Sequence, residues 1–158
     1  MKRVDLLLAG SAVAGVAAVG VGLVSQYRFN MQPCPWCVLQ RLIFCAIAAA
    51  ALLGLAWRPA SGRKVGAALM LLLAGCGVAA ALWQHFVAVA SASCNLTLAE
   101  RIISALGLDE SLPSVFMAMA SCADAAVKVA GVPYEFWSLA LFVALGAAAI
   151  VVLRRPTA

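Results

Sequence analysis

Cys34 and Cys37, which stand in the motif C-P-W-C, are the residues of this chain whose types and spacing most clearly predict chemistry. A pair at this spacing can cycle between a dithiol and a disulfide, with the thiolate as the attacking species. The motif opens a long apolar run that predicts a helix, and Pro35 suits the first turn because it lacks an N–H. The other unpaired N–H groups and the helix dipole favour a thiolate, so we expect a reactive sulfur here.

Arg41 follows Cys37 by four residues and therefore shares its helical face, which brings a cation near the predicted thiolate. An arginine inside an apolar helix is costly without a partner and is a candidate functional residue. His85, in W-Q-H-F near the outer end of the third apolar run, lies at a similar predicted depth. The alternatives are a structural disulfide staple for the motif, an Arg41 that extends to the headgroups, and helix packing for His85.

The elements that position these residues follow from composition. Of 158 residues, 66% are hydrophobic and 11% charged, against roughly 45–50% and about 25% in soluble domains. Four apolar runs, residues 4–24, 38–57, 65–89 and 136–153, are long enough to cross a hydrocarbon core of about 30 Å. We therefore predict a single all-α membrane domain over residues 1–158, a four-transmembrane-helix bundle. The first run exceeds the roughly 7–15 apolar residues of a signal peptide.

Charge predicts how the bundle is oriented. The net charge of +5 is scattered, without the clustered stripe that nucleic acid binding needs, so we expect no nucleic acid partner. In a four-span arrangement the loops 25–37 and 90–135 share one side, and the basic residues of the ends and the short loop share the other. An excess of basic residues marks the cytoplasmic side, so both termini are predicted to be cytoplasmic. The residues counted are Lys2, Arg3, Arg58, Arg63, Lys64, Arg154 and Arg155.

A short helix is predicted in the second outer loop. Thr97 and Glu100 have the spacing of a capping box, and Gly107 is a suitable stop. Apolar residues fall on one stripe between them, so we expect a helix lying on the membrane surface. The stripe consists of Leu98, Ile102, Ala105 and Leu106. The remaining loop, residues 108–132, is predicted to be irregular, with an apolar patch at Val115, Phe116 and Met117 that can enter the membrane interface.

The predicted topology divides the cysteines into two groups. Cys45 and Cys76 fall within helices, where free cysteine behaves as a small hydrophobe, although Cys45 continues the face of Cys37 and Arg41. The other four lie on the outer side, where disulfides persist, and suggest two pairs whose three possible connectivities spacing cannot rank. These are Cys34, Cys37, Cys94 and Cys122. Zinc is disfavoured, because Cys94 and Cys122 lie too far apart for a second short knuckle.

In combination these features resemble the disulfide bond formation protein B (DsbB) family over essentially the whole chain. The resemblance rests on C-P-W-C-V-L-Q-R with Arg41 in place, on the cysteine pair in the long outer loop, and on P-S-V-F-M-A-M-A-S-C leading to Cys122. The stretch G-V-P-Y-E-F-W-S-L resembles the family's entry to its last helix, but carries an acidic residue, Glu135, as a departure. The family works in a DsbA–DsbB–quinone chain that keeps the bacterial periplasm oxidising.

The resemblance implies a relay with catalytic Cys34, Cys37, Cys94 and Cys122. A DsbA-type thioredoxin-like partner attacks a Cys94–Cys122 disulfide, at Cys94. Freed Cys122 then attacks Cys34 and releases Cys37 as a thiolate beside a quinone, either ubiquinone or menaquinone. Arg41 and Cys37, with His85 as a weaker candidate, would bind that quinone, and no metal is expected. The resemblance places the protein in the bacterial inner membrane, with its active site on the periplasmic face and with lipid and the quinone pool around it.

Two other classes of function compete with this interpretation. Quinone-linked reductases of the vitamin K epoxide type also use four cysteines on a helix bundle, but in that family the loop pair precedes the C-x-x-C motif, the reverse of the order here. A small transporter, or a scaffold braced by disulfides, is the second alternative. The predicted helices carry few polar residues of the kind that an ion or solute path requires, which disfavours a transporter.

Overall fold

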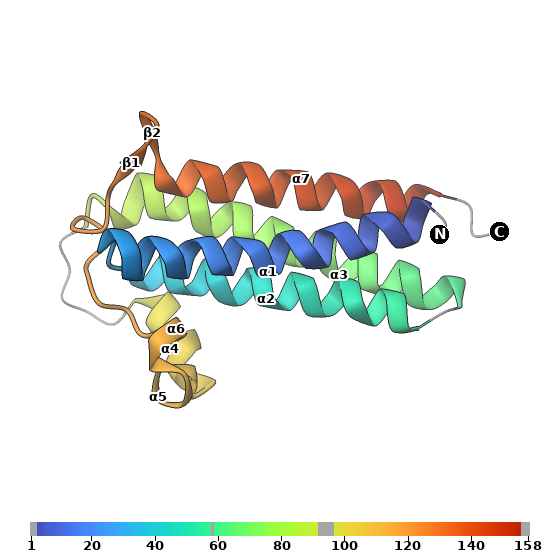
Figure 1. Ribbon diagram of the computed structural model, residues 1–158, viewed down its shortest axis with the longest axis horizontal. Coiled ribbons are helices and arrows are strands. Elements are labelled where there is room, and N and C mark those ends of the chain that lie inside the picture. Colours follow the sequence, from blue (N-terminus) through green and yellow to red (C-terminus); the bar gives the residue numbers. More distant parts are fainter. Residues whose placement is uncertain (1–2, 58, 92–96, 156–158) are drawn as a thin grey trace.

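Four long apolar helices run side by side in the computed structural model, which describes residues 3–57, 59–91 and 97–155 (Figure 1). Each is long and apolar enough to cross a membrane. The predicted all-α, four-helix membrane fold is therefore confirmed. The helices are α1 (Arg3–Phe29), α2 (Pro35–Ala56), α3 (Ala60–Trp83), which a π-helical segment η1 (Gln84–Ala88) continues, and α7 (Tyr134–Arg154).

Three of the helix ends lie beyond their predicted positions. α1 continues to Phe29 instead of residue 24, α2 begins at Pro35 instead of residue 38, and α3 begins at Ala60 instead of residue 65. The apolar run shows only which residues favour lipid, whereas backbone hydrogen bonds continue through polar residues such as Gln26 and Arg28. The ranges predicted from hydropathy are therefore shorter than the helices themselves. The additional residues at the end of α1 reach the site described below.

The bundle is a ring in the order α1, α2, α3, α7. α2 packs between α1 and α3, and α7 packs on α3 and closes against α1. Small residues allow the close approach, as is usual where helices cross in a membrane. A Cβ added at Gly66 on α3 would lie 2.8 Å from the Ala50 carbonyl oxygen of α2. Across the ring the Phe44 and Phe142 rings stack with their centroids 4.1 Å apart.

The two ends of the bundle differ in what they carry. The start of α1 and the end of α7 lie at one end of the bundle, the terminal end (Figure 1). There an Asp5–Arg63 ion pair of 2.9 Å joins α1 to α3. The opposite end, the loop end, holds the connection 30–34 and the long segment between η1 and α7. Lys2 and Arg58, two of the basic residues on which the predicted orientation rests, lie outside the described residues. The other five of these basic residues lie near the terminal end, namely Arg3, Arg63, Lys64, Arg154 and Arg155.

The capping box predicted in the outer loop is confirmed. Glu100 Oε2 accepts a hydrogen bond from the Thr97 N–H at 2.7 Å, and Thr97 Oγ1 accepts one from the Glu100 N–H at 3.3 Å. The helix that follows, α4 (Leu98–Ala105), buries Ala99 and Ile103. The predicted stripe is left largely uncovered by protein, since its end residues Leu98 and Leu106 are both exposed.

The segment predicted to be irregular contains short elements. α5 (Leu108–Ser111) and α6 (Pro113–Phe116) are single turns, and β1 (Lys128–Val129) pairs antiparallel with β2 (Val132–Pro133). The expectation that the patch at residues 115–117 enters the membrane interface is not met at Phe116, whose side chain is buried against Val38 and Ile103. Burial of an aromatic ring between α2 and α4 gives a gain that the sequence pattern alone did not reveal.

Candidate active site

The C-P-W-C motif forms the start of α2, as predicted. Cys34 is the N-cap residue in an extended conformation, and its sulfur accepts a hydrogen bond from the Cys37 N–H at 3.3 Å. One helical turn therefore brings the two side chains together, with the Sγ atoms 2.8 Å apart. Cys34 is completely buried and Cys37 half-buried. The pair is in position to form or break a disulfide without moving the helix.

The loop residue Cys122 reaches the same place because the segment before it is tied to the bundle. The Met119 N–H donates to the carbonyl oxygen of Pro33, the residue before Cys34, at 2.9 Å. Further back, the Tyr27 hydroxyl of α1 donates to the Ser114 carbonyl oxygen at 2.7 Å. Cys122 is thereby buried in the same cluster of residues as Cys34. Residues nearly ninety positions apart in sequence are thus held side by side.

The contact between Cys34 and Cys122 shifts the pKa values of the two thiols in opposite directions. Cys34 donates a hydrogen bond to the Cys122 sulfur, and this contact is the main reason that the pKa of Cys122 lies below its ordinary value. The same contact, together with Cys37 and burial, raises the pKa of Cys34. In the dithiol form this contact therefore favours a Cys122 thiolate next to a Cys34 thiol.

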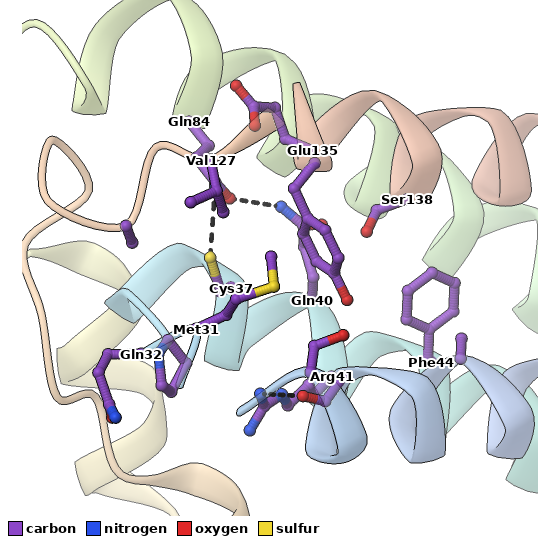
Figure 2. A pocket seen from close by; sticks show the side chains of 16 residues that line it. Met31, Gln32, Cys37, Gln40, Arg41, Phe44, Gln84, Val127, Glu135 and Ser138 are labelled. Atoms are coloured by element: carbon purple, nitrogen blue, oxygen red, sulfur yellow. Dashed lines mark hydrogen bonds between the residues drawn. The ribbon is translucent and has the colours of Figure 1, made fainter. Parts of the chain in front are cut away.

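Cys37 faces a cavity between α1, α2 and α7 (Figure 2). Gln84 Nε2, from the start of η1, donates a hydrogen bond to the Cys37 sulfur at 3.3 Å. Gln40 Nε2, one turn along α2 from Cys37, donates to Gln84 Oε1 at 2.7 Å. Both glutamines are buried. The sulfur at the cavity is therefore held by a chain of two amides, as the dashed lines in Figure 2 show.

Arg41 lines the same cavity, but its hydrogen bonds go to other groups. The guanidinium donates to Gln26 Oε1 at 2.8 Å and to the Gly22 carbonyl oxygen at 3.1 Å, both on α1, and to the Val115 carbonyl oxygen at 3.0 Å. Among the described residues it makes no hydrogen bond to Cys37, although the spacing brings the two residues to one cavity. The buried cation thus joins α1, α2 and the loop segment while standing beside the reactive sulfur.

His85 lies next to the cavity and not in its lining. Its Nδ1 atom is 2.7 Å from Oε1 of Glu135, a buried carboxylate in the first turn of α7 that does belong to the lining. The acidic departure noted in the sequence is therefore the partner of the candidate histidine. Cys45 and Cys76 are exposed on the outside of the bundle, so Cys45 does not line the pocket with Cys37. Cys94 lies outside the described residues.

Three polar residues of the site were missed in the sequence. Gln26, Gln40 and Gln84 are all buried and all bond either Arg41 or Cys37 directly or through one another. Glutamine is common at helix ends and carries no charge, so composition does not single it out. The signal that was available is the cost of an amide within a predicted span, which requires a partner for each such residue.

The cavity next to Cys37 has a volume of about 50 Å³, which is less than the roughly 300–1,000 Å³ of most small-molecule sites. Apolar side chains form part of its wall, and Arg41 and Gln84 bring N–H donors to it. Such a mixture of an apolar wall and a few placed donors is usual for the sites of small organic cofactors. Within residues 3–57, 59–91 and 97–155, no cluster of three or more potential metal ligands occurs.

Cysteines that meet at the start of a membrane helix, beside a cavity, define the class of integral-membrane thiol–disulfide oxidoreductases. Residues 3–152 match the family described as disulfide bond formation protein DsbB. The chain is 32% identical to disulfide bond formation protein B of Nitrosospira multiformis over 156 residues, which cover 97% of this chain and 93% of the relative. It is 35% identical to the protein of the same name from Chromobacterium violaceum over 146 residues, covering 89% and 86%. The chain belongs to the DsbB family and is a multi-pass membrane protein of disulfide bond formation.

Proposed function

We propose that the protein reoxidises a periplasmic DsbA-type dithiol oxidase by disulfide exchange and passes the electrons to a membrane quinone. The observation that carries the proposal is the meeting of three sulfurs at the start of α2, with Cys122 against Cys34 and with Cys37 on the cavity. This order in space is the order in which a pair of electrons would travel. Cys34 stands in the middle of the three and contacts both of the other sulfurs, so it can exchange with either.

The first step of the proposed relay takes place at Cys94, which lies outside the described residues. A thiolate of the reduced partner attacks Cys94 in a Cys94–Cys122 disulfide, forms a mixed disulfide with Cys94 and releases Cys122. The second partner thiol then resolves the mixed disulfide, so that the partner leaves oxidised and Cys94 leaves reduced. The backbone N–H of Trp36, which lowers the pKa of Cys122 whether or not Cys34 carries a proton, makes Cys122 a better leaving group, because a low-pKa sulfur departs faster.

Cys122 next attacks Cys34 in a Cys34–Cys37 disulfide. The S–S bond to Cys37 breaks as the Cys122–Cys34 bond forms, and Cys37 departs as a thiolate. Its position suits this role, since it receives the Gln84 hydrogen bond and stands near the Arg41 cation. Attack by Cys94 on Cys122 then restores the loop disulfide and leaves Cys34 and Cys37 as a dithiol.

Arg41, Gln84 and the apolar wall of the cavity are the residues that would hold a quinone beside Cys37. When bound there, a quinone supplies an acceptor for two electrons and two protons, and so balances the oxidation of the Cys34–Cys37 dithiol to a disulfide. His85 does not line this cavity, but its ring contacts Glu135, which does. We expect His85 to influence the cavity through this contact. Ubiquinone and menaquinone share the ring and carbonyl chemistry that the donors recognise.

We also propose the inner membrane as the location and the loop end as the periplasmic face. The supporting observation is charge, because Arg3, Arg63, Lys64, Arg154 and Arg155 lie at the terminal end, whereas the acidic residues of the outer segment lie at the loop end. Basic residues are retained on the cytoplasmic side. The redox cysteines would then face the compartment in which disulfides form.

The proposal is tested by turnover of the purified chain with ubiquinone and a reduced thioredoxin-like dithiol protein. Loss of quinone absorbance is expected for the unaltered chain, and Cys37→Ser should lower the rate by more than about a hundredfold, because no thiolate then faces the cavity. Cys45→Ser, on the exposed side of the same helix, is the matched control and should keep full turnover. Full turnover by the Cys37→Ser variant would refute the assignment.

A further inference from the structure

We propose that Gln84 is a catalytic residue that stabilises the Cys37 thiolate and so makes the Cys34–Cys37 disulfide a stronger oxidant. The inference rests on the proposed function and deepens it. Gln84 Nε2 donates a hydrogen bond of 3.3 Å to the Cys37 sulfur. A primary amide at a sulfur can either donate an N–H or accept from a thiol. Toward a thiolate only donation is possible, since a thiolate has no proton to give.

Gln40 fixes which end of the Gln84 amide faces the sulfur. Its Nε2 donates to Gln84 Oε1 at 2.7 Å, which occupies the oxygen and leaves the Gln84 N–H₂ group turned toward Cys37 (Figure 2). Both glutamines are 4% exposed. Buried amides keep their partners, because each unpaired polar group costs free energy in an apolar surrounding. The donor orientation is therefore built into the site.

The backbone at Gln84 is held in an uncommon shape. The Val89 N–H donates to the Gln84 carbonyl oxygen at 3.0 Å, a span of five residues that makes η1 a π-helical turn. Such turns occur often at functional sites. The next residue, His85, is bonded to the buried carboxylate of Glu135 on α7. The turn that carries Gln84 is thus fixed from α2 through Gln40 and from α7 through Glu135, so the amide cannot easily move away from Cys37.

A donor at this sulfur affects the two redox states differently. Reduction of the bond takes up two electrons and one proton and gives a Cys34 thiol and a Cys37 thiolate. A disulfide sulfur is a weak hydrogen-bond acceptor, whereas a thiolate is a strong one and gains more from the Gln84 N–H. Stabilising the reduced form makes a dithiol–disulfide couple more oxidising. Gln84 would therefore favour electron entry from Cys122 into the Cys34–Cys37 pair.

The test measures the redox equilibrium of this pair without quinone. A chain that keeps only Cys34 and Cys37, with the other cysteines replaced by Ala, is equilibrated in lipid nanodiscs with mixtures of reduced and oxidised dithiothreitol. Alkylation and mass measurement then give the reduced fraction. Gln84→Met removes the donor at similar volume, and Gln40→Leu removes only its support. Val87→Ala, in the same π-helical turn but away from Cys37, is the control.

We expect Gln84→Met to shift the equilibrium about tenfold toward the disulfide, which is about 30 mV more negative for a two-electron couple. Gln40→Leu should give a smaller shift in the same direction, and Val87→Ala none. An unchanged equilibrium in Gln84→Met would overturn the inference. If variants fail to fold, the unaltered chain labelled with ¹⁵N-glutamine decides: the Gln84 side-chain amide signal should move on reduction, and an unmoved signal would refute the contact. Failure of quinone turnover in the unaltered chain would instead count against the proposed function.

Discussion

At the scale of single residues, Cys34 occupies the central position because its sulfur contacts those of both Cys37 and Cys122. A single buried sulfur with two possible partners can exchange one bond for the other without any large movement. In the dithiol form the pKa of Cys34 is raised and that of Cys122 is lowered, so Cys122 is the sulfur of this pair that ionises first. The backbone N–H of Trp36, at the start of α2, also lowers the pKa of Cys122.

The pKa of Cys122 predicts a pH dependence. In the reduced chain, alkylation of Cys122 by a small neutral reagent should reach half its maximal rate below about pH 8.5, the ordinary cysteine value. The sign follows because a lowered pKa gives more thiolate at neutral pH. Cys34→Ala removes the hydrogen-bond donor and should move the midpoint upward. Peptide mass analysis of the alkylated chain after different times gives the rates.

Cys37→Ala is the control for this titration. It removes a neighbouring charge that raises the pKa of Cys122, and not a donor that lowers it, so it should not move the midpoint upward. Equal midpoints in the unaltered chain and in Cys34→Ala would contradict the Cys34–Cys122 contact.

The sequence indicated part of this site and not the rest. The cysteines stood out because of their type and their spacing. Arg41 stood out because a charged side chain within an apolar helix costs free energy unless it has a partner. Gln84 and Gln40 carry no charge and belong to different helices, so only packing brings them to Cys37. The partner of His85 was equally hidden, since Glu135 lies in the first turn of a helix, fifty residues further along the chain.

At the scale of elements, apolar runs predicted the four helices but not their ends. α1 continues through polar residues such as Gln26, and the start of α2 is capped by the Cys34 sulfur, which accepts a hydrogen bond from the Cys37 N–H. A hydropathy pattern detects neither feature. The capping box predicted α4 correctly, because that signal is local to Thr97 and Glu100. The attachment of residues 114–120 to Tyr27 and Pro33 depends on contacts between distant segments, and no local pattern marks it.

The close approach of α2 and α3 gives a prediction about stability. Gly66→Ala would place a Cβ 2.8 Å from the Ala50 carbonyl oxygen and from Gly54 Cα, backbone atoms that cannot move aside cheaply. We expect a loss of roughly 1–3 kcal/mol in the free energy of unfolding, the usual cost of overpacking. Thermal or denaturant unfolding in detergent measures it.

Gly75→Ala is the matched control on the same helix, because a Cβ there meets no atom within 4 Å. Its unfolding free energy should stay within about 0.5 kcal/mol of the unaltered chain. Equal stability of the two variants would show that α2 and α3 do not cross at Gly66.

At the scale of the whole molecule, the start of α2 and the segment that carries Cys122 lie at one end of the bundle, and the start of α1 and the end of α7 lie at the other (Figure 1). Under the proposed topology, this arrangement would place the sulfurs of Cys34, Cys37 and Cys122 on the opposite side of the membrane from most of the positive charge. Cys37 differs from the other two sulfurs because it also faces the cavity within the bundle. Under the proposed function, this start of α2 would connect a water-soluble protein to a lipid-soluble acceptor.

The orientation is tested by labelling in intact bacterial spheroplasts with a membrane-impermeant thiol reagent. Ser61→Cys, exposed near the start of α3 at the terminal end, should remain unlabelled until the membrane is opened. A cysteine in place of exposed Glu110, in the loop-end segment, should react at once. The opposite pattern would reverse the proposed topology and remove the periplasmic dithiol as the source of electrons.

The central claim is that the Cys34–Cys37 dithiol gives its electrons to a quinone, and disulfide mapping tests it most directly. The fully reduced chain is mixed with ubiquinone without oxygen, quenched after increasing times and digested for mass analysis. The first new bond should join Cys34 to Cys37, with one quinone reduced for each bond, while Cys45 and Cys76 remain thiols. Persistence of the Cys34 and Cys37 thiols in the presence of quinone would contradict the account.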